Sequence, residues 1–217
     1  YIYTMANCMR AAARHGVRVV VCDRPNPIGG AIEGACLQKG WESFVGQYPI
    51  PMRHGMTIGE LARLFNDAFG IGADLEVVPM VGWQRGQYAD ETGLPWVMPS
   101  PNMPTLDTAI VYPGTVLFEG TNVSEGRGTT RSLEVVGAPD VDFSKVLARM
   151  KKMAPQWLKG AVIRGCYFEP TFHKHAGKTC RGLHIHTDHK SYSPSKFKPF
   201  RLFALIFKAI RLEYPSY

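Results

Sequence analysis

Residues 16–30, Gly-Val-Arg-Val-Val-Val-Cys-Asp-Arg-Pro-Asn-Pro-Ile-Gly-Gly, decide the fold class of this chain. They follow a helix-like stretch over residues 3–15, where apolar residues recur at spacings of three and four, and Gly16 ends it. The valine run up to Cys22 is almost continuous in β-branched side chains, as is usual for strands that are covered on both faces. A helix, a glycine and such a strand are typical of the αβ step of a parallel sheet.

The same step recurs over residues 57–79. Thr57 and Glu60 have the spacing of a capping box, apolar residues up to Phe69 share one helical face, and a strand-like run follows at 75–79. Farther along, the pattern predicts a helix over 142–154, strands over 161–168 and 183–187, and a last helix over 199–214. We therefore expect an α/β fold of two domains, with the boundary near residues 137–139.

Composition excludes several classes of protein. The 217 residues are 45% hydrophobic and 20% charged, which favours a packed globular protein over a disordered chain. No window approaches the roughly 18–20 unbroken apolar residues that a membrane-spanning helix needs. The five cysteines are odd in number and widely spaced, which argues against a disulfide framework and a Cys-rich zinc site.

The net charge of +7 is unevenly distributed. Residues 145–217 hold 15 Lys/Arg and 3 Asp/Glu, a net charge of +12, whereas residues 1–144 hold 10 and 15, a net charge of −5. The basic part would attract an anionic polymer, but we expect no nucleic-acid partner because no nucleic-acid motif is present. The chain opens at Tyr1 within a helix-like pattern, so we expect an internal piece of a longer protein.

Two segments offer polar groups beside the predicted elements. Asp23, Arg24 and Asn26 follow the first strand, at the end where open α/β sheets bind ligands; a plain Pro/Gly turn is the alternative. Residues 80–106 are irregular and place Trp and Tyr near carboxylates, which suits either a sugar-binding cleft or the cover of a sheet edge.

The densest group of chemically useful side chains lies at residues 118–131, Phe-Glu-Gly-Thr-Asn-Val-Ser-Glu-Gly-Arg-Gly-Thr-Thr-Arg. Its glycines allow close approach of a ligand, and its two arginines can bind acidic groups beside the two glutamates. The segment lacks the pattern of a phosphate-binding loop, so a nucleotide site is not indicated. A solvated charged loop is the alternative.

Four histidines form two H-x-H pairs, His173 with His175 and His184 with His186. Such a pair in a strand can serve a zinc site, but no H-E-x-x-H motif exists and lysines crowd the first pair. We expect histidines that hydrogen-bond or tune pH dependence beside a cleft, with no metal and no cofactor.

Taken together, these segments resemble the exo-β-N-acetylmuramidase (NamZ-like) family, formerly a domain of unknown function, of which the chain looks like a central fragment. The phrases that carry the resemblance span nearly the whole chain: Asp-Arg-Pro-Asn-Pro at 23–27, Ile-Pro-Met-Arg-His-Gly-Met-Thr at 50–57, Asp-Glu-Thr-Gly-Leu-Pro-Trp at 90–96, Pro-Ser-Pro-Asn-Met-Pro-Thr at 99–105, Phe-Glu-Gly-Thr-Asn at 118–122 and Phe-His-Lys-His-Ala-Gly at 172–177.

The resemblance implies a secreted or periplasmic bacterial glycosidase that releases terminal N-acetylmuramic acid from the non-reducing end of peptidoglycan fragments. It implies a Rossmann-like domain, incomplete here, over residues 1–137 and a smaller α/β domain, also partial, over 138–217. A Pro-Glu-His-Gly-like segment upstream of residue 1 would carry a catalytic glutamate that this chain lacks. Ser132 replaces a proline that is common in relatives.

Glycoside hydrolysis usually needs a carboxylic acid that protonates the leaving oxygen and often a second carboxylate. Our catalytic candidates are Glu119, Glu125 and then Asp23. Muramic acid adds a lactyl carboxylate, which calls for a cation, and its hydroxyls and N-acetyl group call for hydrogen-bonding side chains. The substrate-binding candidates are Arg24, Asn26, His54, Asn102, Asn122, Arg127, Thr130, Arg131, His173 and His175. A metal-dependent amidase or deacetylase and a non-catalytic wall-binding module are the alternatives, and the oligomeric state is left open.

Overall fold

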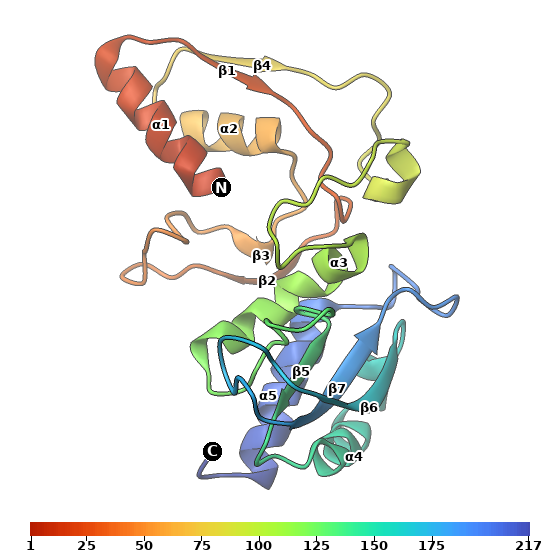
Figure 1. Cartoon of the computed structure of the whole chain (residues 1–217). Coiled ribbons are helices and arrows are strands. Elements are labelled where there is room, and N and C mark those ends of the chain that lie inside the picture. The colour runs from red at the N-terminus through yellow and green to blue at the C-terminus, as the bar shows by residue number, and fades with distance from the viewer. The chain divides into compact units, whose positions relative to one another are not determined.

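The computed structural model describes residues 1–217 and divides them into two compact units, Tyr1–Pro95 and Trp96–Tyr217. The first unit runs from α1 (Ile2–His15) to η1 (Ala89–Thr92), and the second runs from α3 (Leu106–Thr115) to α5 (Pro199–Glu213) (Figure 1). None of the α-helices combines the length and apolar character that crossing a bilayer requires.

The first unit contains the two predicted αβ steps. Helix α1 (Ile2–His15) ends at Gly16 in the left-handed conformation and leads to β1 (Val19–Cys22), while α2 (Ile58–Asp67) leads to β4 (Leu75–Val78). Strands β1 and β4 pair in parallel, and α2 packs against both of them. The parallel pairing confirms the α/β class that the valine run predicts.

The core of the first unit lies where α1 meets α2, with Ala6, Met9, Leu61, Ala62 and Phe65 all buried. Thr57 caps α2 as its spacing predicts, because its hydroxyl accepts from the amide of Glu60 and the Glu60 carboxylate accepts from the amide of Thr57. An antiparallel pair, β2 (Glu33–Cys36) with β3 (Pro51–Arg53), and the short 3₁₀ helix η1 (Ala89–Thr92) are additions that the sequence pattern does not predict.

The second unit packs helices against a three-stranded antiparallel sheet of order β5-β7-β6. Its elements in chain order are α3 (Leu106–Thr115), η2 (Val116–Gly120), β5 (Val135–Ala138), α4 (Phe143–Met153), η3 (Pro155–Leu158), β6 (Val162–Phe168), β7 (Cys180–His186) and α5 (Pro199–Glu213). Helix α5 contacts α3 and α4, and the ring of Phe118 stacks on that of Phe207 at 4.2 Å between centroids. The predicted helices at 142–154 and 199–214 and both predicted strands are confirmed.

The chain divides at Pro95, which differs from the boundary expected near residue 137. Strand β5 runs through that position and pairs with β7 over its whole length, from Val135 opposite His184 to Ala138 opposite Arg181. Residues 96–137 therefore belong to the same compact unit as the strands and helices that follow.

Two glycines allow β5 and β7 to lie against each other. Gly137 and Gly182 are register partners, and a Cβ at Gly182 would stand 2.2 Å from the carbonyl oxygen of Val136 and 2.8 Å from the ring of Phe168. Gly165 on β6 faces open space, with nothing within 4 Å of a Cβ there. The sheet therefore has room for a side chain at Gly165 but not at Gly182.

We predict that Gly182→Ala lowers the free energy of unfolding by about 1–3 kcal/mol, the usual cost of overpacking. Gly165→Ala is the matched control in the same sheet and should leave the unfolding free energy unchanged or slightly raised. Urea unfolding followed by circular dichroism measures both. Equal effects of the two substitutions would contradict this account of the sheet.

Candidate functional site

The candidate residues fall into three groups. Four of them, Asp23, Arg24, Asn26 and His54, lie in the first unit. In the second unit, one group surrounds the buried carboxylate of Glu125, and we call it the Glu125 centre; it contains Glu119, Asn122, Arg127, His173 and His175. Another group surrounds the buried carboxylate of Glu134, and we call it the Glu134 centre; among the candidates it contains Arg131. Asn102 accepts from the hydroxyl of Ser132 at 3.3 Å and pairs with neither buried carboxylate. Thr130 is exposed and belongs to neither centre.

Three cationic or potentially cationic side chains face Glu125, whose side chain has no exposed surface. Its Oε2 atom lies 2.7 Å from the Nζ of Lys174, and its Oε1 atom lies 3.2 Å from the Nε of Arg127 and 3.4 Å from the Nδ1 of His173. Burying a carboxylate is costly unless cations and hydrogen bonds compensate it. Glu125 therefore holds these partners in place and cannot itself reach a solvent-borne sugar in this conformation.

Lys174 joins two segments that are far apart in the sequence. Besides Glu125, its ammonium group donates to the carbonyl oxygens of Phe118 at 2.6 Å and Val123 at 3.1 Å, so all three of its donors are used. It is flanked by His173 and His175, both in the left-handed backbone region at φ 70° and 58°. That conformation is strained for a residue with a Cβ, and it persists only where surrounding contacts enforce it.

Further contacts fix the loop of Lys174 over residues 118–131. The Nε2 of His175 lies 2.6 Å from the carbonyl oxygen of Asn122, and Thr171 donates its amide and its hydroxyl to the carbonyl oxygen of Gly128, both at 2.9 Å. A Cβ at Gly128 would stand 2.7 Å from the carbonyl oxygen of Phe172, at a φ of 85°. The glycine at this position is therefore required by the close approach of the two loops.

Arg127 connects the buried Glu125 to the exposed Glu119. Its Nη2 atom pairs with the Oε1 of Glu119, whose side chain is 40% exposed. Burial raises the pKa of the nearby Tyr112, Glu119 raises it further, and Arg127 opposes the shift, so the phenol keeps its proton at neutral pH. The Glu125 centre therefore has one accessible carboxylate, that of Glu119. It pairs with the guanidinium of Arg127, which the buried Glu125 holds in place.

Glu134 is the buried carboxylate of the other centre, with 3% of its side chain exposed. It accepts from the hydroxyl of Thr108 at 2.9 Å and from Arg131 at 3.1 Å, and the Nε2 of His184 lies 3.7 Å away. Burial raises the pKa of Glu134, but the neighbouring His184, the hydrogen bond from Thr108 and the charge of Arg131 outweigh it, so the net shift is downward. Glu134 is therefore held as the carboxylate.

The second H-x-H pair belongs to a hydrogen-bonded network. His184 and His186 lie on one face of β7 with ring centroids 3.7 Å apart. The Nε of Arg164 donates to the Nε2 of His186 at 2.9 Å, and the Nδ1 of His186 lies 3.1 Å from Asp188. His173 and His175 lie in a loop instead of a strand, and no three His, Cys, Asp or Glu side chains gather as metal ligands.

In the first unit, Asp23 joins the end of β1 to the start of α2. Its Oδ1 accepts from the amides of Gly59 at 2.8 Å and Arg24 at 2.9 Å, and its Oδ2 accepts from the hydroxyl of Thr57 at 3.0 Å. A Cβ at Gly59 would stand 2.8 Å from the Asp23 carboxyl carbon. Both carboxylate oxygens of Asp23 therefore accept hydrogen bonds that hold the fold together, whereas the side chain of Arg24 is exposed and has no partner.

Asn26 and His54 also hold this turn. The Nδ2 of the buried Asn26 donates to the carbonyl oxygen of Met56 at 3.0 Å, and its Oδ1 accepts from the amide of Ile28 at 3.1 Å. The Nδ1 of His54 accepts from the amide of Met56 at 3.1 Å, and burial lowers the pKa of this histidine. A neutral His54 is the state that accepts this hydrogen bond.

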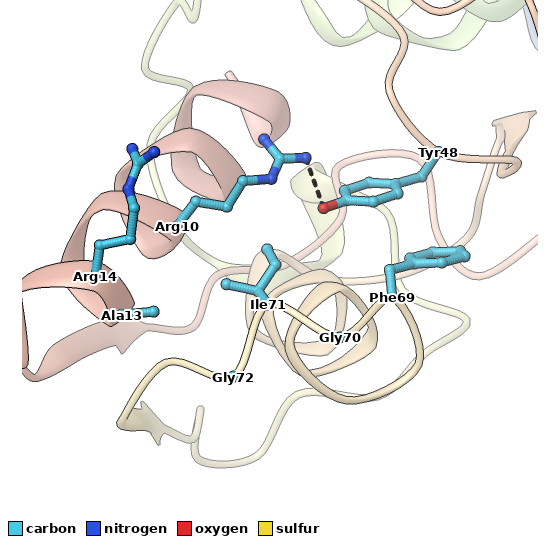
Figure 2. Close-up of a pocket in the computed structure, with 8 residues that line it drawn as sticks. All are labelled: Arg10, Ala13, Arg14, Tyr48, Phe69, Gly70, Ile71 and Gly72. Carbon is cyan, nitrogen blue, oxygen red and sulfur yellow. Dashed lines mark hydrogen bonds between the residues drawn. The ribbon is translucent and has the colours of Figure 1, made fainter.

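A cavity of about 480 Å³ lies between α1 and the end of α2 (Figure 2). Figure 2 shows Arg10 reaching the hydroxyl of Tyr48, at 2.7 Å, and the ring of Phe69 lies on that of Tyr48 with centroids 4.5 Å apart. The lining residues are Arg10, Ala13, Arg14, Tyr48, Phe69, Gly70, Ile71 and Gly72. No candidate residue lines this cavity, so it is separate from the three groups.

Two family models match the chain in tandem. The N-terminal model of exo-beta-N-acetylmuramidase NamZ matches residues 1–107, and the C-terminal model matches residues 110–217. The chain belongs to the NamZ family. This confirms the family resemblance that the sequence phrases carry.

Relatives of the chain are longer than the chain itself. It is 47% identical over all 217 residues to the peptidoglycan beta-N-acetylmuramidase NamZ of Bacillus subtilis (strain 168), and it spans about half, 51%, of that protein. A DUF1343 family protein of Bacteroides fragilis is similar in structure, with a TM-score of 0.89 and 30% identity over the whole chain and 56% of that protein. A second DUF1343 protein of the same species gives a TM-score of 0.68 and 26% identity over the whole chain and 64% of that protein.

The region that matches the NamZ C-terminal model contains both buried carboxylates, Glu125 and Glu134, and the cation Lys174. Lys174 and Glu134 organise the two centres, but in the sequence Lys174 is only a charge beside two histidines, and no motif marks Glu134 as a site residue. The available signal for Lys174 was its place between two histidines in a short Pro- and Gly-bounded loop. For Glu134 it was the spacing of three from Arg131, just before an apolar run.

We predict that Lys174→Met lowers the free energy of unfolding by about 3–5 kcal/mol, because it leaves the Glu125 carboxylate buried without its ammonium partner. Lys178→Met, four residues away and exposed, is the matched control and should change the unfolding free energy by less than about 0.5 kcal/mol. Urea unfolding at pH 7 measures both. A Lys174 variant as stable as the control would show that the pair does not hold the loops.

We predict a pH-dependent effect of Glu134→Gln. Because the pKa of Glu134 is lowered in the fold, its carboxylate contributes stability that is present above the ordinary value of 4.5 and is lost as pH falls through the lowered pKa. The variant should be less stable by about 1–3 kcal/mol at pH 7, and the difference should shrink in acid. Urea unfolding across pH 7 to about pH 3, with the exposed Glu169→Gln as control, measures it; a difference that is constant with pH would contradict the assignment.

Proposed function

We propose that the complete protein is an exo-acting glycoside hydrolase that releases terminal N-acetylmuramic acid from the non-reducing end of peptidoglycan fragments. The observation that carries the proposal is the tandem match of both NamZ models, over residues 1–107 and 110–217. The 47% identity to the Bacillus subtilis peptidoglycan beta-N-acetylmuramidase supports the same activity. Export from the cytoplasm follows as part of the proposal, because peptidoglycan is an extracytoplasmic polymer.

The Glu125 centre supports a division of roles between its two glutamates. Glu119 is 40% exposed and is fixed by Arg127, so it can contact a sugar. Glu125 has no exposed surface, and both of its oxygens face cationic side chains. In this proposal Glu119 is the carboxylate that acts on the substrate, and Glu125 is a positioning residue that fixes Arg127.

Arg131 is the cation that best fits the lactyl carboxylate of muramic acid. Its side chain is 46% exposed, and only its Nη1 atom pairs with a protein group, at 3.1 Å from Glu134. Its Nε and Nη2 atoms are left to donate side by side, which is the arrangement that binds a carboxylate in bidentate fashion. Arg127 fits this role less well, because Glu119 and Glu125 already occupy its guanidinium.

The decisive experiment compares Glu119→Gln with Glu125→Gln in the complete protein, using a disaccharide of N-acetylmuramic acid and N-acetylglucosamine. Glu119→Gln should lower muramic acid release by about 10²–10⁴-fold without loss of stability, which is the usual range for a catalytic carboxyl group. Glu125→Gln should lower both the activity and the free energy of unfolding, because it removes the charge that holds Arg127 and Lys174.

The exposed Glu42→Gln serves as the control and should leave turnover unchanged. Unchanged turnover in Glu119→Gln would remove Glu119 from the mechanism. Release of acetate or peptide instead of muramic acid would favour a deacetylase or an amidase. Binding of wall polymer without any turnover would favour a binding module.

A further inference from the structure

Asp107 is an acidic group that interacts electrostatically with Glu134, Asp188 and Arg131, and one of its oxygens is not used by any protein group. Asp107 lies in the first turn of α3, and its Oδ1 accepts from the hydroxyl of Thr187 at 2.8 Å. Its Oδ2 has no partner, and the side chain is only partly buried. The group is therefore fixed through one oxygen and open at the other.

Asp107 is the only one of the three acidic groups here that is open in this way. Glu134 is buried and receives hydrogen bonds on both oxygens, from Thr108 and from Arg131. Asp188 has its Oδ1 atom 3.1 Å from His186 and its Oδ2 atom 3.9 Å from Arg131. A ligand that meets this carboxyl group thus finds one available oxygen, and the charge of Arg131 acts on the same group.

The surroundings of Asp107 raise the pKa of its carboxyl group, and burial is the largest cause. Burial raises its pKa, the carboxylates of Glu134 and Asp188 raise it further, and the Thr187 hydrogen bond and the Arg131 charge only partly oppose these effects. The shifted pKa values of the other carboxyl groups, those of Glu60, Glu134, Asp142 and Asp188, all go down. The pKa of Asp107 is thus shifted in the opposite direction to those of its neighbours Glu134 and Asp188. Such a separation is a common sign that one carboxyl group serves as an acid.

We propose that Asp107 is a further catalytic residue, which gives its proton to the glycosidic oxygen as the bond to muramic acid breaks. This proposal rests on the glycosidase activity proposed above. The proton leaves the Asp107 carboxyl group, the bond between C1 and the glycosidic oxygen breaks, and the leaving sugar departs as an alcohol. A water oxygen then bonds to C1, and the proton that this water releases to solvent balances the one that Asp107 regains.

The test compares two glycosides of N-acetylmuramic acid that differ only in the leaving group: the natural disaccharide and a 4-nitrophenyl glycoside. A sugar alcohol needs a proton to leave, whereas nitrophenolate does not. Asp107→Asn should lower turnover of the disaccharide by about 10²–10⁴-fold and turnover of the nitrophenyl glycoside by less than about 10-fold. The asparagine keeps an oxygen that can accept from Thr187, so the fold should be retained, and thermal unfolding checks this.

Asp140→Asn, an exposed aspartate of the same unit, is the control and should leave both rates unchanged. Asp107→Glu keeps an acid at this position and should recover part of the disaccharide rate. Equal losses on both substrates, or no loss on the disaccharide, would overturn the role of Asp107 alone. A wild-type protein that hydrolyses neither glycoside would overturn the proposed function and this role with it.

Discussion

The ion pair between Glu125 and Lys174 is the interaction on which the candidate site depends. The side chain of Glu125 has no exposed surface, and the ammonium group of Lys174 lies 2.7 Å from its carboxylate. The same ammonium group also donates hydrogen bonds to the main-chain oxygens of Phe118 and Val123. Removing the Lys174 charge would leave the Oε2 atom of the buried Glu125 without its cation, and removing the Glu125 charge would leave the ammonium group facing only main-chain oxygens. Either loss is more costly than the loss of a surface pair. This constraint explains why the backbone on both sides of Lys174 tolerates the left-handed conformation at His173 and His175.

The two centres of the second unit share one organisation. In each, a buried carboxylate that cannot meet a ligand fixes an arginine: Glu125 fixes Arg127, and Glu134 fixes Arg131. In the Glu125 centre the accessible group is Glu119, which pairs with Arg127. In the Glu134 centre it is the edge of the Arg131 guanidinium that does not pair with Glu134. Preorganisation of this kind is what a hydrolase requires, because polar groups that are already oriented need not reorganise as charge develops.

The sequence predicts those features that depend on local pattern. Helices α1 and α2, the parallel strands and the capping box follow from apolar spacing, glycine stops and the Thr57–Glu60 pair. Helix α3 is missed because it contains Pro113 and its apolar residues do not gather on one face. The sequence indicates both glutamates of the loop at 118–131 as candidates. It does not predict that one is buried and the other exposed, because contacts with His173 and Lys174, about 50 residues farther along the chain, determine this. Glu134 is not predicted either, because its partners Thr108 and His184 are distant in the sequence.

A double-mutant cycle on the complete protein tests the central claim most directly. It compares the unfolding free energies of the wild type, Glu125→Gln, Lys174→Met and the double variant in urea at neutral pH. If the buried pair holds the loops together, the two substitutions will be non-additive, with a coupling free energy of at least about 1 kcal/mol, because the second loses little once the first partner is gone. Additive effects, within about 0.3–0.5 kcal/mol, would show that the two side chains act independently and would contradict the account.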